Sequence, residues 1–121
     1  MDKYYVFLEE AKELKVLGFG VGCDRGKLVN TDLISKSIYP TDFNANQIEY
    51  VSLPLYAQAF DWFEEVHGLK SWIITSILQD KVLHSFKING VDYTEIGYTK
   101  KEKAQLDCLR ELITIVKNRK E

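Results

Sequence analysis

The sequence of 121 residues lacks the features that mark exported, membrane-spanning or disulfide-stapled proteins. Its only cysteines, Cys23 and Cys108, lie far apart in the chain. No apolar run approaches the roughly 20 residues of a membrane span, since the longest, residues 71–78, reads SWIITSIL. The opening segment MDKYYVFLEE has no basic region followed by an apolar one, as a signal peptide would. We therefore expect a cytoplasmic protein whose cysteines remain thiols.

An excess of one charge is also missing. The 16 basic and 18 acidic residues give a net charge of −2, too small to predict general affinity for nucleic acid. The hydrophobic content of 45% argues against disorder. A chain of this length buries about two-thirds of its unfolded surface, which is enough for a core without staples. We expect one globular domain over residues 1–121.

Two helices are predicted in the first half of the chain. Residues 4–17 place apolar side chains at helical spacing, and Gly18 can end that helix. Residues 53–67 form the second, with Ser52 as the N-cap and Gly68 at the C-cap position. Its apolar stripe contains Leu55, Tyr56, Ala59, Phe60, Trp62, Phe63 and Val66, whereas Gln58, Asp61, Glu64 and Glu65 lie on the opposite side. Residues 18–51 give the weakest pattern.

Three strands follow, at residues 70–78, 81–88 and 91–96. The first two are rich in β-branched and aromatic residues or alternate in polarity. Asn89-Gly90 is a strong hairpin signal, because both turn positions require positive φ. These strands predict an antiparallel meander, which a strand from residues 19–29 would extend.

The last helix is predicted from Thr99 to about residue 117. Thr99 and Glu102 match a capping box. An apolar stripe follows, made of Leu106, Leu109, Leu112, Ile113 and Val116, with Cys108 beside it. Three helices covering one face of a small antiparallel meander make an α+β fold, a two-layer single domain.

Asp61, Glu64 and His67 are three residues apart and would share one helix face, as metal ligands on a helix do. No His-rich or Cys-rich partner motif completes the coordination shell. A solvated polar face explains the row better, and the aromatic stripe beneath it is interpreted as core. We expect no metal and no cofactor.

Cys23 is the other candidate for catalysis. A cysteine nucleophile needs a base within hydrogen-bond reach, and neither His67 nor His84 lies in a recognised catalytic signature. The glycine-rich segment GFGVGCDRGK does not complete a P-loop, because Gly22 and Gly26 are four residues apart and Leu28 replaces the hydroxyl residue. We expect no enzyme activity.

Basic residues give the candidate binding surface. Lys100, Lys101 and Lys103 crowd the first turn of the last helix, where the helix dipole favours acids. A phosphate bound there would explain them, and Arg25 and Lys27 in the glycine-rich loop would add to the surface. The alternative interpretation is that these lysines are simply solvated.

Several segments resemble one family. FLEEAKELKVLGF is similar to its opening helix, YVSLPLYAQAFDWFEEVHGL to a recurring aromatic segment, and GYTKKEKAQLDCLRELITIVK to its closing helix. The family consists of small proteins of Bacteroidetes phages, prophages and mobile elements. The likeness covers most of the chain except residues 20–48. Lys100 and Lys101 depart from it, since the family often has acids there.

The resemblance implies a phage-derived inhibitor of a bacterial defence system. The expected function is that of an anti-CRISPR protein that binds an RNA-targeting type VI effector nuclease, or its guide RNA, without catalysis. The alternative is a small phage nucleic-acid-binding accessory protein. A minor enzyme that uses Cys23 or the Asp61–Glu64–His67 row, and a homodimeric structural protein, remain further alternatives.

Overall fold

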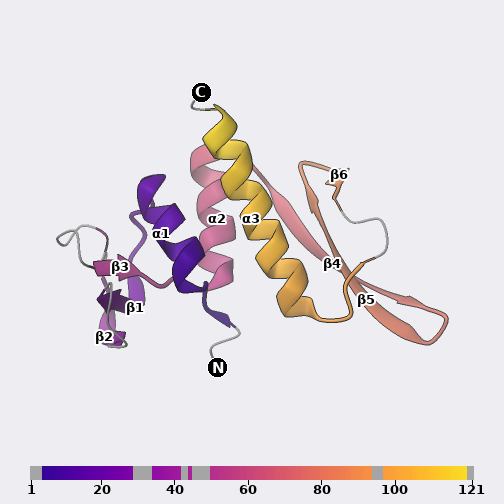
Figure 1. Cartoon of the computed structure of the whole chain (residues 1–121), viewed down its shortest axis with the longest axis horizontal. Helices are drawn as coiled ribbons and strands as arrows, with labels where there is room; N and C mark the ends of the chain where they lie inside the picture. Colours follow the sequence, from indigo (N-terminus) through magenta and orange to yellow (C-terminus); the bar gives the residue numbers. More distant parts are fainter. Residues whose placement is uncertain (1–3, 29–33, 42–43, 45–49, 94–96, 120–121) are drawn as a thin grey trace. The chain divides into compact units, whose positions relative to one another are not determined.

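The computed structural model describes residues 4–28, 34–41, 44, 50–93 and 97–119 (Figure 1). These residues form three α-helices and two three-stranded antiparallel sheets, ordered β2-β1-β3 and β4-β5-β6. The α+β prediction with an antiparallel meander is therefore confirmed. The elements are α1 (Leu8–Val16), β1 (Cys23–Leu28), β2 (Ile34–Thr41), β3 (Tyr50–Ser52), α2 (Tyr56–His67), β4 (Ser71–Leu78), β5 (Lys81–Ile88), β6 (Val91–Asp92) and α3 (Lys101–Arg119).

The chain divides into two compact units, Met1–Trp62 and Phe63–Glu121, and the boundary falls inside α2. In the first unit, α1 begins at Leu8 and not at residue 4 as predicted. Before it the chain is extended, because Tyr5 bridges to Leu55 and the N–H of Val6 donates to the carbonyl of Pro54 at 2.9 Å.

The predicted end of α1 is confirmed. Gly18 has a φ of 95°, and its N–H donates to the carbonyl of Lys15 at 3.1 Å. The N–H of Phe19 donates to the carbonyl of Leu14 at 3.0 Å, which completes a Schellman motif. Phe19 and Leu14 are both buried, so the motif also fixes two core side chains.

The segment after α1 builds a sheet that the sequence did not predict. β1 lies within the predicted strand 19–29, but it pairs with β2 and β3 and does not extend the meander. Pro40 lies in β2, an edge strand of this sheet, which is where a residue without an N–H is tolerated. Residues 29–33, 42–43 and 45–49 of the irregular region lie outside the described residues.

α2 starts at Tyr56, and the predicted N-cap at Ser52 is wrong. Ser52 ends β3, and its N–H donates to Oδ1 of Asn44 at 2.9 Å. The helix start is held by Gln58, whose Oε1 accepts the N–H of Leu55 at 2.9 Å. This is the glutamine half of a capping box. Gly68, at φ 66°, ends the helix as predicted.

The aromatic stripe of α2 is core, as predicted. Tyr56, Ala59, Trp62 and Phe63 are buried, and Asp61, Glu64 and Glu65 are exposed. The prediction fails at Val66, which is 58% exposed, so the buried stripe ends one turn before the helix does.

The second unit contains the predicted meander. β4 and β5 pair in continuous register from Ser71–Ile88 to Leu78–Lys81. Asn89 and Gly90 both have positive φ, as the predicted type I′ turn requires, and so do Gln79 and Asp80 at the other turn. β6 is shorter than predicted, and residues 94–96 lie outside the described residues.

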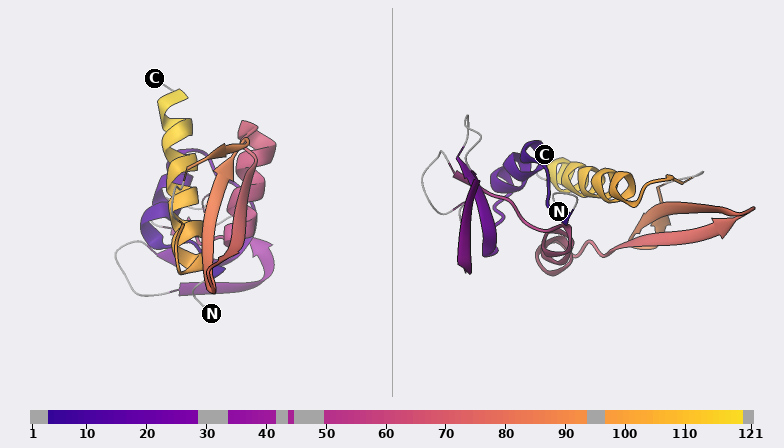
Figure 2. Two further views of the ribbon diagram at one scale, coloured as in Figure 1. Left: turned by 90° about the vertical axis from the view of Figure 1, so that its right-hand side faces the viewer. Right: turned by 90° about the horizontal axis from the view of Figure 1, so that it is seen from below.

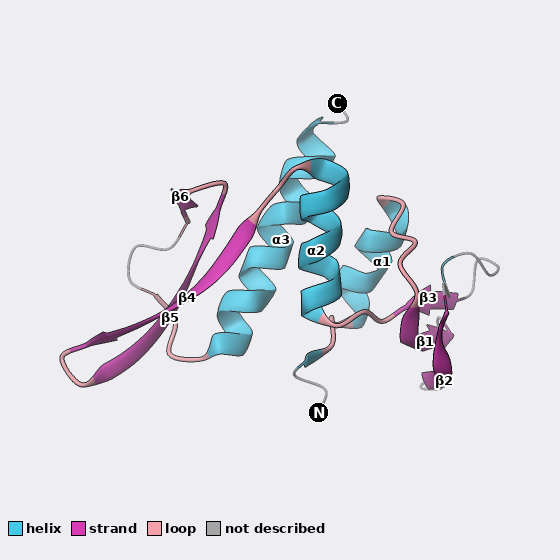
Figure 3. Cartoon of the chain, turned by 180° about the vertical axis from the view of Figure 1, so that it is seen from behind, coloured by secondary structure: helices cyan, strands magenta, loops and turns pink. Residues whose placement is uncertain are grey.

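α3 forms the second layer of this unit and packs along β5 and β4 (Figure 3). Its predicted stripe of Leu106, Leu109, Leu112, Ile113 and Val116 is buried, and so is Cys108. Each such side chain stabilises the fold by at most about 1.5–3 kcal/mol. The helix begins at Lys101, one residue later than a Thr99 cap implies. Among the described residues, no helix has the length and apolar character to cross a membrane.

Candidate functional site

The predicted basic residues fall in both units. Lys100, Lys101 and Lys103 are exposed at the start of α3, in the second unit. Nζ of Lys103 lies 3.4 Å from Oδ1 of Asp107, one turn along the helix. Such an exposed ion pair is worth less than about 1 kcal/mol, so Lys103 remains available to a partner.

Arg25 and Lys27 lie on β1 in the first unit, and the prediction that they are in a loop is wrong. The guanidinium of Arg25 sits 4.1 Å from the centroid of the Tyr5 ring, a cation–π contact. The backbone of Lys27 pairs with Ile34 and Val51. A single surface that joins Arg25 and Lys27 to Lys100, Lys101 and Lys103 stays a prediction.

Two residues of the candidate metal row of α2 are solvated, whereas the third, His67, has a buried Nε2 and packs its ring against Phe63 with centroids 5.9 Å apart. Asp61 and Glu64 are exposed, and the Glu64 carboxylate lies 3.9 Å from Nζ of Lys70. In the part of the chain that the structure describes, no three His, Cys, Asp or Glu side chains are arranged to hold an ion.

The two cysteines are buried thiols in different units. Sγ of Cys23 donates to the carbonyl of Val21 at 3.4 Å. Burial raises the pKa of the Cys108 thiol to about 12, against a smaller lowering by the Ser71 hydroxyl. A thiol with that pKa is protonated at neutral pH and is a poor nucleophile.

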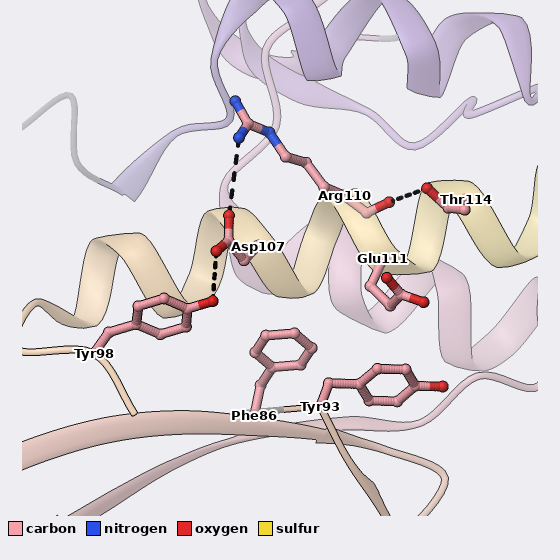
Figure 4. A pocket seen from close by; sticks show the side chains of 7 residues that line it. All are labelled: Phe86, Tyr93, Tyr98, Asp107, Arg110, Glu111 and Thr114. Carbon is pink, nitrogen blue, oxygen red and sulfur yellow. Dashed lines mark hydrogen bonds and ion pairs between the residues drawn. The ribbon is translucent and has the colours of Figure 1, made fainter. Parts of the chain in front are cut away.

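A cavity of about 290 Å³ lies between α3 and the sheet of the second unit (Figure 4). The rings of Phe86 and Tyr93 form its floor, stacked with centroids 5.8 Å apart and planes 7° apart. The N–H of Tyr93 donates to the carbonyl of Phe86 at 3.4 Å, which keeps the backbones of the two residues next to each other. The lining is completed by Tyr98, Asp107, Arg110, Glu111 and Thr114.

One end of the cavity is a hydrogen-bonded network. The hydroxyl of Tyr98 donates to Oδ2 of Asp107 at 2.6 Å, and Oδ1 of Asp107 lies near Lys103 and, at 3.8 Å, Nη1 of Arg110. The hydrogen bond to the Asp107 carboxylate, then burial, then the carboxylate's charge raise the pKa of Tyr98 above its ordinary value. This network fixes the Tyr98 ring against α3.

Backbone contacts position Tyr98. Its N–H and C=O exchange hydrogen bonds of 2.6 and 2.7 Å with His84 of β5. Gly97 makes this approach feasible, because a Cβ there would lie 3.2 Å from the carbonyl oxygen of His84. The imidazole of His84 is half-exposed, and its Nδ1 lies 3.0 Å from Oγ1 of Thr75.

None of the cavity residues was predicted as a site. Three of them come from the sheet side and four from α3, and only the tertiary fold brings Phe86 to Glu111. One signal was present in the sequence: Asp107 and Glu111 lie one turn apart beside an otherwise apolar stripe. Acids at the margin of a buried face are the cue that would have indicated a polar cavity.

Comparisons of the chain with protein-family models, curated proteins and solved structures find no match.

Proposed function

We propose that this chain is a non-catalytic, cytoplasmic inhibitor that binds a bacterial defence nuclease and covers part of its surface. The resemblance to phage proteins implies that the chain acts in an infected bacterial cell. The RNA-targeting type VI effector of that cell is the target we propose first. The observation that supports surface binding is the exposed apolar end of the β4–β5 hairpin.

At that end the apolar face of the hairpin continues beyond the layer of α3. Ile77 and Val82 are directly opposite each other in register, and they are 78% and 49% exposed. Phe86, further along the same face, is only 4% exposed. Figure 2 shows the ribbon extending past the start of α3. Exposed apolar side chains on a two-stranded ribbon suit contact with another protein.

Lysines lie toward the same end of this unit. In Figures 1 and 3, α3 begins toward the same end of this unit as the turn between β4 and β5. Lys101 and Lys103 lie in the first turn of α3, and Lys100 directly precedes it. We call these three lysines together with Ile77 and Val82 the hairpin–lysine surface. Apolar side chains and cations exposed on one unit suit a partner surface that offers apolar side chains together with acids or phosphates.

The test is inhibition of RNA cleavage by a purified type VI effector with its guide. We expect stoichiometric inhibition by the chain. Ile77→Lys and the triple reversal of Lys100, Lys101 and Lys103 to Glu should each weaken it at least about tenfold, as loss of a central contact does. Val16→Lys, at an apolar position 75% exposed on α1, is the matched control. Wild-type chain that neither binds nor inhibits the effector contradicts the proposal.

The alternative, a nucleic-acid-binding accessory protein, is favoured by one observation, the three exposed lysines at the start of a helix. A gel shift with purified RNA and DNA separates the two functions. An accessory protein binds the nucleic acid alone, and its affinity falls steeply with salt. An inhibitor that binds the nuclease itself shows no shift until the effector is added, whereas one that binds the guide RNA shifts that RNA and not unrelated RNA or DNA.

A further inference from the structure

The cavity between α3 and the sheet lies outside the hairpin–lysine surface and has chemistry of its own. Its floor offers aromatic rings: Phe86 is almost wholly buried, but Tyr93, stacked against it, is 41% exposed. Figure 4 shows the Glu111 carboxylate hanging from α3 above these rings. A carboxylate above an accessible aromatic ring is an arrangement that favours a cation between them.

The two carboxylates that line the cavity differ in their partners. The Asp107 carboxylate accepts the Tyr98 hydroxyl and lies within 4.0 Å of two cationic groups. Among the described residues, no hydrogen bond or ion pair engages the carboxylate of Glu111, which is half-buried. Glu111 therefore brings a negative charge to the cavity with no described cation opposite it.

Arg110 does not supply that missing cation. Its side chain extends toward Asp107, away from Phe86 and Tyr93 (Figure 4). The hydroxyl of Thr114 is likewise occupied, since it donates to the carbonyl of Arg110 at 2.9 Å. The part of the cavity above Tyr93 is thus bordered by one aromatic face and one carboxylate.

We propose that this cavity binds an organic cation, an alkylammonium group that rests on the ring of Tyr93 and pairs with Glu111. The volume of about 290 Å³ is at the small end for ligand sites, which suits one side-chain head or a small amine. The cation pairs with a carboxylate that would otherwise be hydrated. The aromatic rings bind a bulky, weakly hydrated cation most tightly, because such a cation loses little hydration energy on binding. This inference is independent of the nuclease-binding proposal.

The test is an NMR titration of the full chain, read at the amide resonances of Tyr93, Glu111 and Thr114. Choline represents a free small cation, and a Gly-Ser peptide with one trimethyllysine represents a protein side chain. The neutral carbon isostere of choline, with C in place of N⁺, is the control ligand. We expect saturable shifts at these resonances with both cations, and the tighter of the two identifies the source of the ligand.

Matched variants locate the site. Glu111→Gln keeps the shape of the side chain and should weaken cation binding at least about threefold, while Tyr93→Leu should weaken it by a similar factor. Glu102→Gln removes a carboxylate from the exposed first turn of the same helix and should bind like the wild type. Equal affinity for the neutral isostere, equal affinity of Glu111→Gln, or no saturable shift up to about 0.1 M ligand would each overturn the proposal.

Discussion

Gly97 occupies the place where the chain returns to β5 before α3 begins. Its φ of 92° already disfavours any side chain, and a Cβ would also lie 3.2 Å from the carbonyl oxygen of His84 and 3.3 Å from Cβ of Leu83. Gly97→Ala should therefore lower the free energy of unfolding by about 2–3 kcal/mol. Urea denaturation followed by circular dichroism measures this change.

Gly90→Ala is the matched control, because Gly90 has a similar φ of 85° with nothing within 4 Å of the added Cβ. This substitution should lower the free energy of unfolding by only about 1 kcal/mol, because it adds the strain of a side chain at positive φ and no close contact. The difference between the two variants reports the close approach to β5. If Gly97→Ala costs no more than Gly90→Ala, the His84–Tyr98 pairing is not held as tightly as the structure has it.

Tyr98 should show its raised pKa in a phenol titration. The bond to the Asp107 carboxylate favours the neutral phenol, so the pKa in the folded state lies above the ordinary value of 10.0. The stabilisation from this shift is complete below pH 10.0 and is lost as pH rises from there through the folded pKa. Difference absorbance between the wild type and Tyr98→Phe isolates this tyrosine among seven.

Asp107→Asn removes the main cause and should return the Tyr98 midpoint toward the ordinary value. Glu102→Gln, on the same helix, should leave it unchanged. The wild type should also lose stability faster above pH 10.0 than Tyr98→Phe does. A titration midpoint for Tyr98 in the wild type at or below the ordinary value of 10.0 contradicts the hydrogen bond between Tyr98 and Asp107.

Cys108 should be almost inert toward thiol reagents in the folded protein. Its pKa of about 12 leaves a negligible thiolate fraction at pH 8, and the side chain is wholly buried. Ellman's reagent should modify it only as fast as the protein opens. The variant Cys23→Ala isolates Cys108 for this measurement. Rapid modification in the absence of denaturant contradicts the prediction.

Gln58 holds the start of α2 by two bonds that its place on the polar face did not suggest. Oε1 accepts the N–H of Leu55 at 2.9 Å, and Nε2 donates to the carbonyl of Gly22 at 3.0 Å, 36 residues earlier. Gln58→Ala should lower the free energy of unfolding by about 1–3 kcal/mol, because both bonded groups lose their partner. Glu65→Ala, at an exposed position of the same helix, should change it by less than about 0.5 kcal/mol. Equal values for the two variants would refute this role for Gln58.

Elements with a strong local signal were predictable from sequence. β5 has the predicted bounds, and the Asn89-Gly90 turn and the buried stripe of α3 follow from turn chemistry and helical spacing. Asn89 does more than turn the chain, since its Oδ1 accepts the N–H of Lys70 at 2.9 Å. Hydrogen bonds between residues far apart in the chain cannot be predicted from a local sequence pattern.

Elements whose pairing is set by distant residues were not predictable. The sheet β2-β1-β3 is built from strands that contain glycine, proline and lysine, which are poor strand signals, and it forms through pairing between strands that a local pattern does not reveal. The start of α2 at Tyr56 depends on the bonds that Gln58 and Tyr5 make to Leu55, the residue before it. The cavity has the same origin, because it is formed by side chains that approach only after α3 packs on the sheet.

The molecule as a whole is joined through α2. The boundary between the two units falls between Trp62 and Phe63, so one helix of 12 residues supplies buried side chains to both. A helix of that length is marginal when isolated in water, because nucleation is costly. Unfolding of either unit would remove burial from half of α2 and destabilise the half that remains. We therefore expect the two units to unfold together.

The two tryptophans test this coupling, because Trp62 belongs to the first unit and Trp72 to the second. Trp72→Phe leaves Trp62 as the fluorescent reporter, and Trp62→Phe leaves Trp72. In each variant the urea midpoint from fluorescence should agree with that from circular dichroism within about 0.2 M, as one cooperative transition requires. Comparing two probes within one variant removes the effect of the substitution on stability. If the fluorescence midpoint departs from the dichroism midpoint in either variant, α2 does not couple the units, and residues 1–121 are two folding units and not the one predicted domain.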